Sequence, residues 1–154
     1  MVEVELITVA PTAPEALDAV RQYFHELNER FPSGFDATAA LASDVGALGP
    51  PGGAFVLMRH GVTTIACGGV QRVDTLTGEI KRMWIHRDWR GLGLGRRMLE
   101  HLEGVARTLG YSRFILDTNA VLVEAIAMYQ KAGYVAIERY NDNPYAQRWF
   151  AKDG

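Results

Sequence analysis

The sequence predicts an α+β fold in which a mixed, mostly antiparallel sheet of about seven strands is flanked by about four helices. Three observations support this prediction. Apolar residues change along the chain between the two-residue period of strands and the three-to-four-residue period of helices. Short turns separate three consecutive strand-like segments in the middle of the chain, which is typical of an antiparallel meander. A glycine-rich loop then leads directly into an amphipathic helical segment.

The first third of the chain is expected to contain one strand, two helices and a turn. Residues 4–10 partly alternate between polar and apolar side chains, as a strand does. Thr12 and Glu15 have the spacing of a capping box, which predicts the start of a helix that a Phe-Pro-Ser-Gly segment ends. Asp36 is a candidate cap for a short second helix, and the cluster of Gly and Pro at 49–53 predicts a turn.

The remaining elements follow from the same patterns, and two glycines have the position expected just after a helix end. The expected order is strands at 54–59, 63–73 and 79–85, a helix with the apolar stripe Leu94, Met98, Leu102, Val105 and Leu109 before Gly110, a strand at 113–118, a helix at 122–132 before Gly133, and strands at 134–140 and 145–151. No repeat or linker divides the chain, so we expect a single domain over residues 1–154.

Composition excludes several classes of protein. A net charge of −2 argues against a broad nucleic-acid-binding face. No apolar run approaches the ~18 residues that cross a bilayer, so no membrane partner is expected. The N-terminus lacks a basic signal-peptide region, and Cys67 is the single cysteine, so we expect a cytoplasmic protein. Cys67 has no His and Asp arrangement that would make it a nucleophile, and the four histidines lack metal-ligand spacing, so no metal is expected.

The most informative segment is the loop at 90–95. Residues 81–97 contain six basic side chains and one acid, which indicates a local anionic ligand in an otherwise acidic protein. Glycines at 91, 93 and 95 let the backbone approach an oxyanion closely, and the N–H groups of the following helix start have no partner within the helix. We therefore expect a phosphate or pyrophosphate site. The spacing fits neither a P-loop nor a dinucleotide fingerprint, which disfavours an NAD enzyme.

The spacing that remains, Arg90-x-x-Gly93-x-Gly95, resembles the pyrophosphate-binding motif of the GCN5-related N-acetyltransferases, the GNAT superfamily. The resemblance extends to the preceding strand, to Leu-Asp-Thr-Asn after the fifth strand and to the Met-Tyr-Gln-Lys-Ala-Gly-Tyr helix end. It implies a sheet that splays between strands 4 and 5, acetyl-CoA as co-substrate and pantetheine paired with the fourth strand. The cofactor-binding residues that it implies are Met83, Trp84, Ile85, Arg90, Gly91, Leu92, Gly93, Leu94, Gly95, Arg96, Asn119 and Tyr129.

The same resemblance suggests catalytic residues. Glu79 matches the catalytic glutamate of some family members and is the candidate general base; the alternative is a strand-end glutamate that only pairs with a nearby cation. Regular alternation would place Glu79, Lys81, Met83 and Ile85 on one face of the strand. Tyr129 matches the tyrosine thought to protonate the CoA thiolate; the alternative is a core aromatic residue. For Asn119, helix capping and cofactor contact are both open.

The expected reaction is transfer of an acetyl group from acetyl-CoA to a primary amine by direct attack in a ternary complex. The acceptor, a small molecule or a peptide, would enter opposite CoA, where the acids Glu26, Glu29, Asp36 and Asp142 would suit a cation. A non-catalytic acyl-CoA-binding or sensing module on the same fold is the alternative. The acceptor's identity, the length of the acyl group and the oligomeric state stay open, and a homodimer paired through the last strands is one arrangement.

Overall fold

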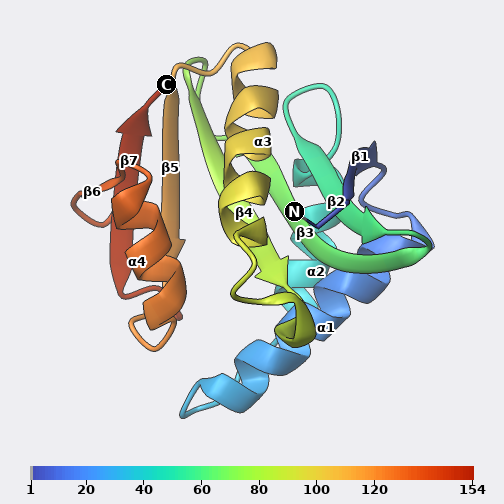
Figure 1. Ribbon diagram of the computed structural model, residues 1–154. Coiled ribbons are helices and arrows are strands. Elements are labelled where there is room, and N and C mark those ends of the chain that lie inside the picture. Colours follow the sequence, from blue (N-terminus) through green and yellow to red (C-terminus); the bar gives the residue numbers. More distant parts are fainter. Residues whose placement is uncertain (1) are drawn as a thin grey trace.

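The computed structural model describes residues 2–154, which form one seven-stranded sheet with helices on both faces (Figure 1). The order of elements confirms the α+β prediction. In chain order they are β1 (Glu5–Val9), α1 (Pro14–Arg30), α2 (Thr38–Ala47), β2 (Ala54–His60), β3 (Thr63–Arg72), β4 (Thr77–Ile85), the 3₁₀ turn η1 (Arg87–Trp89), α3 (Leu94–Thr108), β5 (Arg113–Thr118), α4 (Val123–Lys131), β6 (Val135–Ala136) and β7 (Arg148–Asp153).

The sheet is mixed and has one parallel pair of strands. Its order is β1-β2-β3-β4-β5-β7-β6, and every neighbouring pair except β4 and β5 is antiparallel. Helix α3 makes the crossover that a parallel pair requires. Only Thr77–Glu79 pair with Arg113–Ile115. Beyond these residues β4 and β5 diverge, as Figure 1 shows, and the edge of β4 that faces β5 has no partner strand.

Two apolar cores lie on opposite faces of the sheet. One core packs α3 and α4 against the sheet, with Met98, Leu102 and Phe114 at its centre. The other packs α1 and the end of α2 against the opposite face, and its centre includes Phe24 and Phe55. Figure 1 shows α3 and α4 together on the near face of the sheet, with α1 and α2 behind it. Helices therefore cover both faces of the sheet, including the region where β4 and β5 diverge.

The helix ends agree with the sequence at most positions. Gly110 and Gly133 directly follow the C-caps of α3 and α4 and have φ of +99°, which confirms the predicted helix ends. The predicted capping box at Thr12 is wrong, because the helix begins one residue later, with Ala13 as its N-cap and no side-chain cap. The predicted cap at Asp36 is also wrong by one residue, because Ala37 is the N-cap of α2 and the helix has no side-chain cap, although Asp36 Oδ1 accepts from the N–H of Thr38 at 3.0 Å.

The C-terminal hairpin is shorter than the sequence pattern predicted. The expected strand at 134–140 is paired only at Val135–Ala136, and β7 begins at Arg148. The segment between them turns because two asparagines bond their own backbone two residues on. Asn141 Oδ1 accepts from the N–H of Asn143, and Asn143 Oδ1 accepts from the N–H of Tyr145. These turns withdraw the chain from the ladder and place it beside the end of β5.

Candidate functional site

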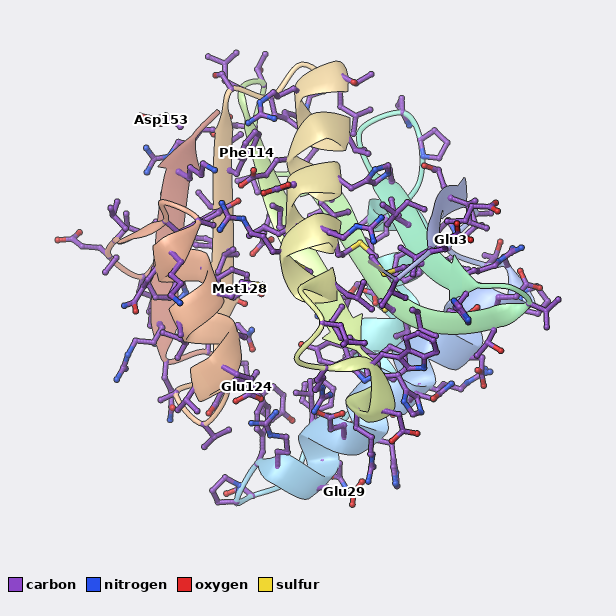
Figure 2. The ribbon with its side chains drawn as sticks, in the orientation of Figure 1. Glu3, Glu29, Phe114, Glu124, Met128 and Asp153 are labelled. Carbon is purple, nitrogen blue, oxygen red and sulfur yellow. The ribbon has the colours of Figure 1, made fainter. Side chains whose placement is uncertain are left out.

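A cleft of about 290 Å³ occupies the region where β4 and β5 separate. Its walls come from α1, β4, η1, the start of α3, the end of β5 and α4. Figure 2 shows Glu124 and Met128 on the side of α4 that faces this region. The cleft exists because the β4–β5 ladder stops after Glu79 and Ile115; if the two strands stayed paired, no space would remain between them.

A β-bulge at Arg82 divides β4 into two halves. Between the pairs Gly69–Lys81 and Cys67–Trp84, strand β3 has one residue and β4 has two. Arg82 has φ of +57°, a conformation that costs a non-glycine residue about 1–2 kcal/mol. A buried ion pair holds it there: its Nε and Nη2 donate to the two carboxylate oxygens of Asp44 at 2.9 and 3.0 Å.

The bulge corrects the expectation that Glu79, Lys81, Met83 and Ile85 share a face. Lys81 pairs with Gly69, whose absent side chain would meet Leu48 of the core beneath α1. Met83 and Ile85 instead pack against the core beneath α3. The extra residue inverts the alternation, so Glu79 and Lys81 belong to the α1 face and Met83 and Ile85 to the α3 face.

The glycine loop presents a run of free backbone donors. In the part of the chain that the structure describes, no acceptor takes a hydrogen bond from the N–H groups of residues 91–96. Gly91 and Gly93 have φ of +79° and +76°, which favours glycine at both positions. Gly93 is the N-cap of α3, so the donors lie at the positive end of the helix dipole. Six unpaired donors at a helix start can bind an anion such as a pyrophosphate.

Arg90 is engaged within the protein. Its Nη2 donates to both carboxylate oxygens of Glu26, at 2.6 and 2.8 Å, and its Nε donates to the carbonyl of Ile85 at 3.0 Å. The guanidinium therefore joins the loop, β4 and α1 at the cleft wall. Its charge is already balanced by Glu26, so phosphate binding by this side chain requires the ion pair to exchange partners.

Tyr129 is the buried aromatic residue at the α4 wall. Its side chain is 7% exposed and lines the cleft, between the rings of Tyr134 and Phe150 at 5.9 and 6.5 Å. No residue among those described accepts or donates a hydrogen bond at its hydroxyl. Burial, followed by the nearby Tyr23 and Asp117, raises the pKa of Tyr129 above its ordinary value of 10. The hydroxyl is therefore a neutral proton donor at physiological pH.

Glu79 lies outside the cleft lining. It is 4% exposed, and its carboxylate accepts from Gln71 Nε2 at 2.7 Å and from the Tyr140 hydroxyl at 2.6 Å. Burial and the adjacent Glu79 charge raise the pKa of Tyr140, so its hydroxyl stays a donor to this carboxylate. Glu79 thus ties the end of β3 and the C-terminal hairpin to β4.

The cleft lining includes most, but not all, of the residues expected to bind the cofactor. Asn119 is absent from it, because its Nδ2 donates to the carbonyl of Tyr145 at 2.7 Å and its Oδ1 accepts from the N–H of Val121 at 3.0 Å. The second bond forms an Asx turn ahead of α4, whose N-cap is Leu122 and which has no side-chain cap, so Asn119 does not cap this helix. Leu92 and Arg96 are exposed beyond the lining. The expected residues that do line the cleft are Met83, Trp84, Ile85, Arg90, Gly91, Gly93, Leu94, Gly95 and Tyr129.

Asp117 lines the cleft and was missed by the sequence interpretation. It is half-buried near the end of β5, and its Oδ2 accepts from Asn141 Nδ2 at 2.6 Å and from Asn143 Nδ2 at 3.3 Å. Its Oδ1 receives no hydrogen bond from the described residues. The Leu-Asp-Thr-Asn run drew attention to this segment. It did not show that Asp117 lies where β4 and β5 separate, because that position depends on how the strands pair.

The acids expected to attract a cationic acceptor do not form one site. Of the four, only Glu26 lines the cleft, and Arg90 balances its charge. Glu29 pairs with His25 on the exposed face of α1, and Asp142 pairs with Arg139 in the exposed loop. Asp36 is exposed at the start of α2. These acids are solvated because they lie on outward-facing turns and helix positions.

Within residues 2–154, no three His, Cys, Asp or Glu side chains are grouped so that they could hold a metal ion. None of the helices in that range combines the length and the apolar character needed to span a bilayer.

Comparison with known proteins identifies the family. The model of the acetyltransferase (GNAT) family matches residues 17–134. An IAA acetyltransferase of Azospirillum brasilense is 34% identical over 130 residues, which cover 83% of this chain and 84% of that one.

Solved structures share the fold at low sequence identity. A GNAT-family acetyltransferase of Staphylococcus aureus Mu50 matches with a TM-score of 0.84 at 15% identity, over 98% of this chain and 99% of that one. One of Elizabethkingia anophelis with acetyl-CoA bound matches with a TM-score of 0.71 at 16% identity, over 97% of each chain. Together with the family match, the split sheet and the glycine loop, these likenesses lead to one conclusion: the chain belongs to the acetyltransferase (GNAT) family, in which an acyl group is transferred from acetyl-CoA.

Proposed function

We propose that this protein is an N-acetyltransferase that transfers the acetyl group of acetyl-CoA to a primary amine within a ternary complex. The observation that carries the proposal is the cleft at the β4–β5 split, whose lining includes four residues with free backbone donors, Gly91, Gly93, Leu94 and Gly95, together with Tyr129. The donors suit the pyrophosphate of CoA, and the unpaired edge of β4 suits its pantetheine arm. Tyr129 lines the same cleft, and we assign its hydroxyl to the thioester sulfur.

The amine must lose a proton before it can attack the thioester. At pH 7 a lysine-like ammonium, with a pKa of about 10.4, costs roughly 4–5 kcal/mol to deprotonate. Among the described residues, Asp117 is the carboxylate of the cleft lining that has no ion pair, and its Oδ2 is already held in place by Asn141 and Asn143. We therefore assign the amine contact to Asp117. Glu79, which does not line the cleft, would act through Tyr140 and the hairpin as a positioning residue.

The bonds and protons balance in one sequence of steps. The ammonium gives one proton to Asp117, and the neutral nitrogen attacks the thioester carbon. A backbone N–H of β4 near Trp84 or Ile85 stabilises the oxyanion that forms. The oxyanion then collapses, the C–S bond breaks, and Tyr129 gives its proton to the departing thiolate. The amide nitrogen loses its second proton, which restores Tyr129, while Asp117 releases its proton to solvent, so the net products are the N-acetyl amine, CoA thiol and one proton.

Two measurements test this function. Calorimetric titration should show saturable binding of acetyl-CoA at micromolar concentrations and none of NAD. Release of free thiol from acetyl-CoA should then depend on an added primary amine. Absence of binding would refute the assignment of the glycine loop. Binding without thiol release for any amine would favour the alternative, a non-catalytic acyl-CoA-binding module on the same fold.

Matched variants separate the roles of the acids. Asp117→Asn keeps the shape and the contacts to the asparagines, and we expect it to lower kcat by about 10²–10⁴-fold without changing acetyl-CoA affinity. Glu79→Gln preserves the side chain's volume and should have a smaller effect on kcat. If Glu79→Gln abolishes turnover while Asp117→Asn leaves it intact, the two assignments must be exchanged. Tyr129→Phe should slow thiol departure and leave binding unchanged.

A further inference from the structure

Five of the seven charged side chains that line the cleft are held in ion pairs. Seven charged side chains belong to the lining: Glu26, Arg30, Lys81, Arg82, Arg90, Asp117 and Glu124. Arg90 pairs with Glu26 at 2.6 Å, Arg30 pairs with Glu124 at 2.6 Å, and Arg82 pairs with Asp44 beneath the cleft at 2.9 Å. Lys81 has no ion pair or hydrogen bond with the described residues, and Asp117 contacts only neutral amides. One cation and one anion are therefore left for a ligand.

These two residues occupy corresponding positions on the two sides of the split. The last parallel pair of the ladder joins Glu79 of β4 to Ile115 of β5. Lys81 and Asp117 each lie two residues beyond that pair, so both are the first residues past the split that share its sheet face. That face is the α1 side, opposite the core that packs Met83 and Ile85. An acceptor on this face thus meets a positive charge from one strand and a negative charge from the other.

We propose that the acceptor is an amine that also carries a carboxylate, as a free amino acid does, and that Lys81 binds that carboxylate. The proposal rests on the acetyl transfer proposed above, with the amine at Asp117. The Lys81 side chain is half-buried in the cleft lining and has no partner among the described residues, so a ligand carboxylate can form a charge-assisted hydrogen bond with it. A plain alkylamine would satisfy Asp117 and leave Lys81 uncompensated, so the pair discriminates against it.

The rest of the acceptor would meet apolar and aromatic surface. Tyr23 and Leu27 of α1 and Leu122 before α4 line the cleft near the two charges. Burial raises the pKa of Tyr23 to about 12, so its ring presents a neutral hydroxyl there. An amino acid with an aromatic or aliphatic side chain therefore fits this wall better than an acidic one.

The test compares amines that differ only in the carboxylate. Thiol release from acetyl-CoA would be measured with phenylalanine and phenethylamine, with alanine and ethylamine, and with lysine and cadaverine. We expect the carboxylate member of the best pair to have at least a 10-fold higher kcat/KM. Lys81→Met, which keeps the length of the side chain, should remove this preference by lowering kcat/KM for the amino acid about 10-fold or more, and it should leave the decarboxylated amine within about 2-fold. Lys131→Met, on the exposed end of α4, is the matched control and should change neither.

Other outcomes would overturn the proposal. One is that the wild-type protein has a higher kcat/KM for the decarboxylated amine than for the amino acid. The other is that Lys81→Met lowers kcat/KM equally for both members of a pair while its acetyl-CoA affinity is retained. Lys81→Glu should invert the preference towards cadaverine, which a merely structural lysine would not do. Binding of the product N-acetylphenylalanine to the CoA complex supplies a readout independent of turnover. If no amine is acetylated but this binding depends on Lys81, the transfer reaction fails and the acceptor subsite stands.

Discussion

Replacing Asp44 by asparagine tests whether the buried ion pair under β4 holds the bulge that divides the strand. The Asp44 and Arg82 side chains are only 9% and 15% exposed, and two hydrogen bonds of 2.9 and 3.0 Å join them. Asparagine keeps the shape of Asp44 but removes its charge. Arg82 then stays buried with a neutral partner, held otherwise by the ring of Phe24, whose centroid lies 5.1 Å from the guanidinium carbon.

The magnitude follows from the burial and from the backbone. Removing one partner of a buried ion pair costs about 3–5 kcal/mol, and the residual exposure here points to the lower end, about 3 kcal/mol. Arg82→Gly also breaks the pair, but glycine adopts the φ of +57° freely and recovers about 1–2 kcal/mol. Its net cost is therefore about 1–2 kcal/mol. The double variant carries no unpaired charge, so it should be about 2–3 kcal/mol more stable than the sum of the two losses predicts.

Urea unfolding of the wild type, both single variants and the double variant, followed by circular dichroism at pH 7 and fixed salt, measures this coupling. Asp44→Asn should lower the midpoint with an unchanged m-value, and Arg82→Gly should keep its acetyl-CoA affinity because the bulge persists. Losses that add to within about 0.5 kcal/mol would refute the coupling. Loss of acetyl-CoA binding in Arg82→Gly would show that the arginine side chain, rather than the bulge, shapes the donor half of the cleft.

Two further predictions concern the glycine loop and Tyr129. Gly93→Ala introduces a side chain at φ of +76° without a steric clash, so it should destabilise the fold by about 1–2 kcal/mol and weaken acetyl-CoA binding. Gly104→Ala, inside α3 with open space around its Cβ, should stabilise the fold by up to about 1 kcal/mol and leave acetyl-CoA binding unchanged. Thermal unfolding measures the change in stability, and calorimetry measures the change in binding. Because the pKa of Tyr129 is raised above 10, its proton remains in place as pH rises, so kcat should not fall between pH 7 and 9.5. An alkaline decline in that range that disappears in Tyr129→Phe would contradict this assignment.

The sequence predicted the elements well wherever a local pattern decides the structure. The apolar stripe of α3 and the glycine at each helix end depend on neighbours within one or two turns, and these predictions were confirmed. The closing hairpin was misjudged because its apolar and aromatic residues resemble a strand. The side chains of Asn141 and Asn143 turn the backbone there, and an Asx turn competes with a ladder only in a tertiary context that a sequence pattern does not contain.

The site was predictable where one continuous segment forms it. The glycine loop and the start of α3 are adjacent in the chain, so spacing alone indicated an anion site. The inverted faces of β4 were not predictable, since a bulge at an arginine with positive φ has no signature in the alternation of apolar residues. Asp117 was missed for a different reason: its importance comes from the point at which two parallel strands separate, which is a property of the sheet.

The bulge has a consequence for how acceptor binding and acetyl-CoA binding are divided between residues. Without it, Lys81 and Met83 would share a face, and a change that improves contact with the acceptor would also alter the surface beneath the donor. With it, Glu79 and Lys81 belong to the α1 side, where Asp117 also lies, and Met83 and Ile85 belong to the α3 side, next to the free donors of the glycine loop. The unpaired backbone edge of β4 lies between these two faces, and no side chain of Glu79, Lys81, Met83 or Ile85 is shared by both. Acceptor specificity can therefore change through side chains on one face while the binding of acetyl-CoA, which depends on backbone groups and on the other face, is preserved.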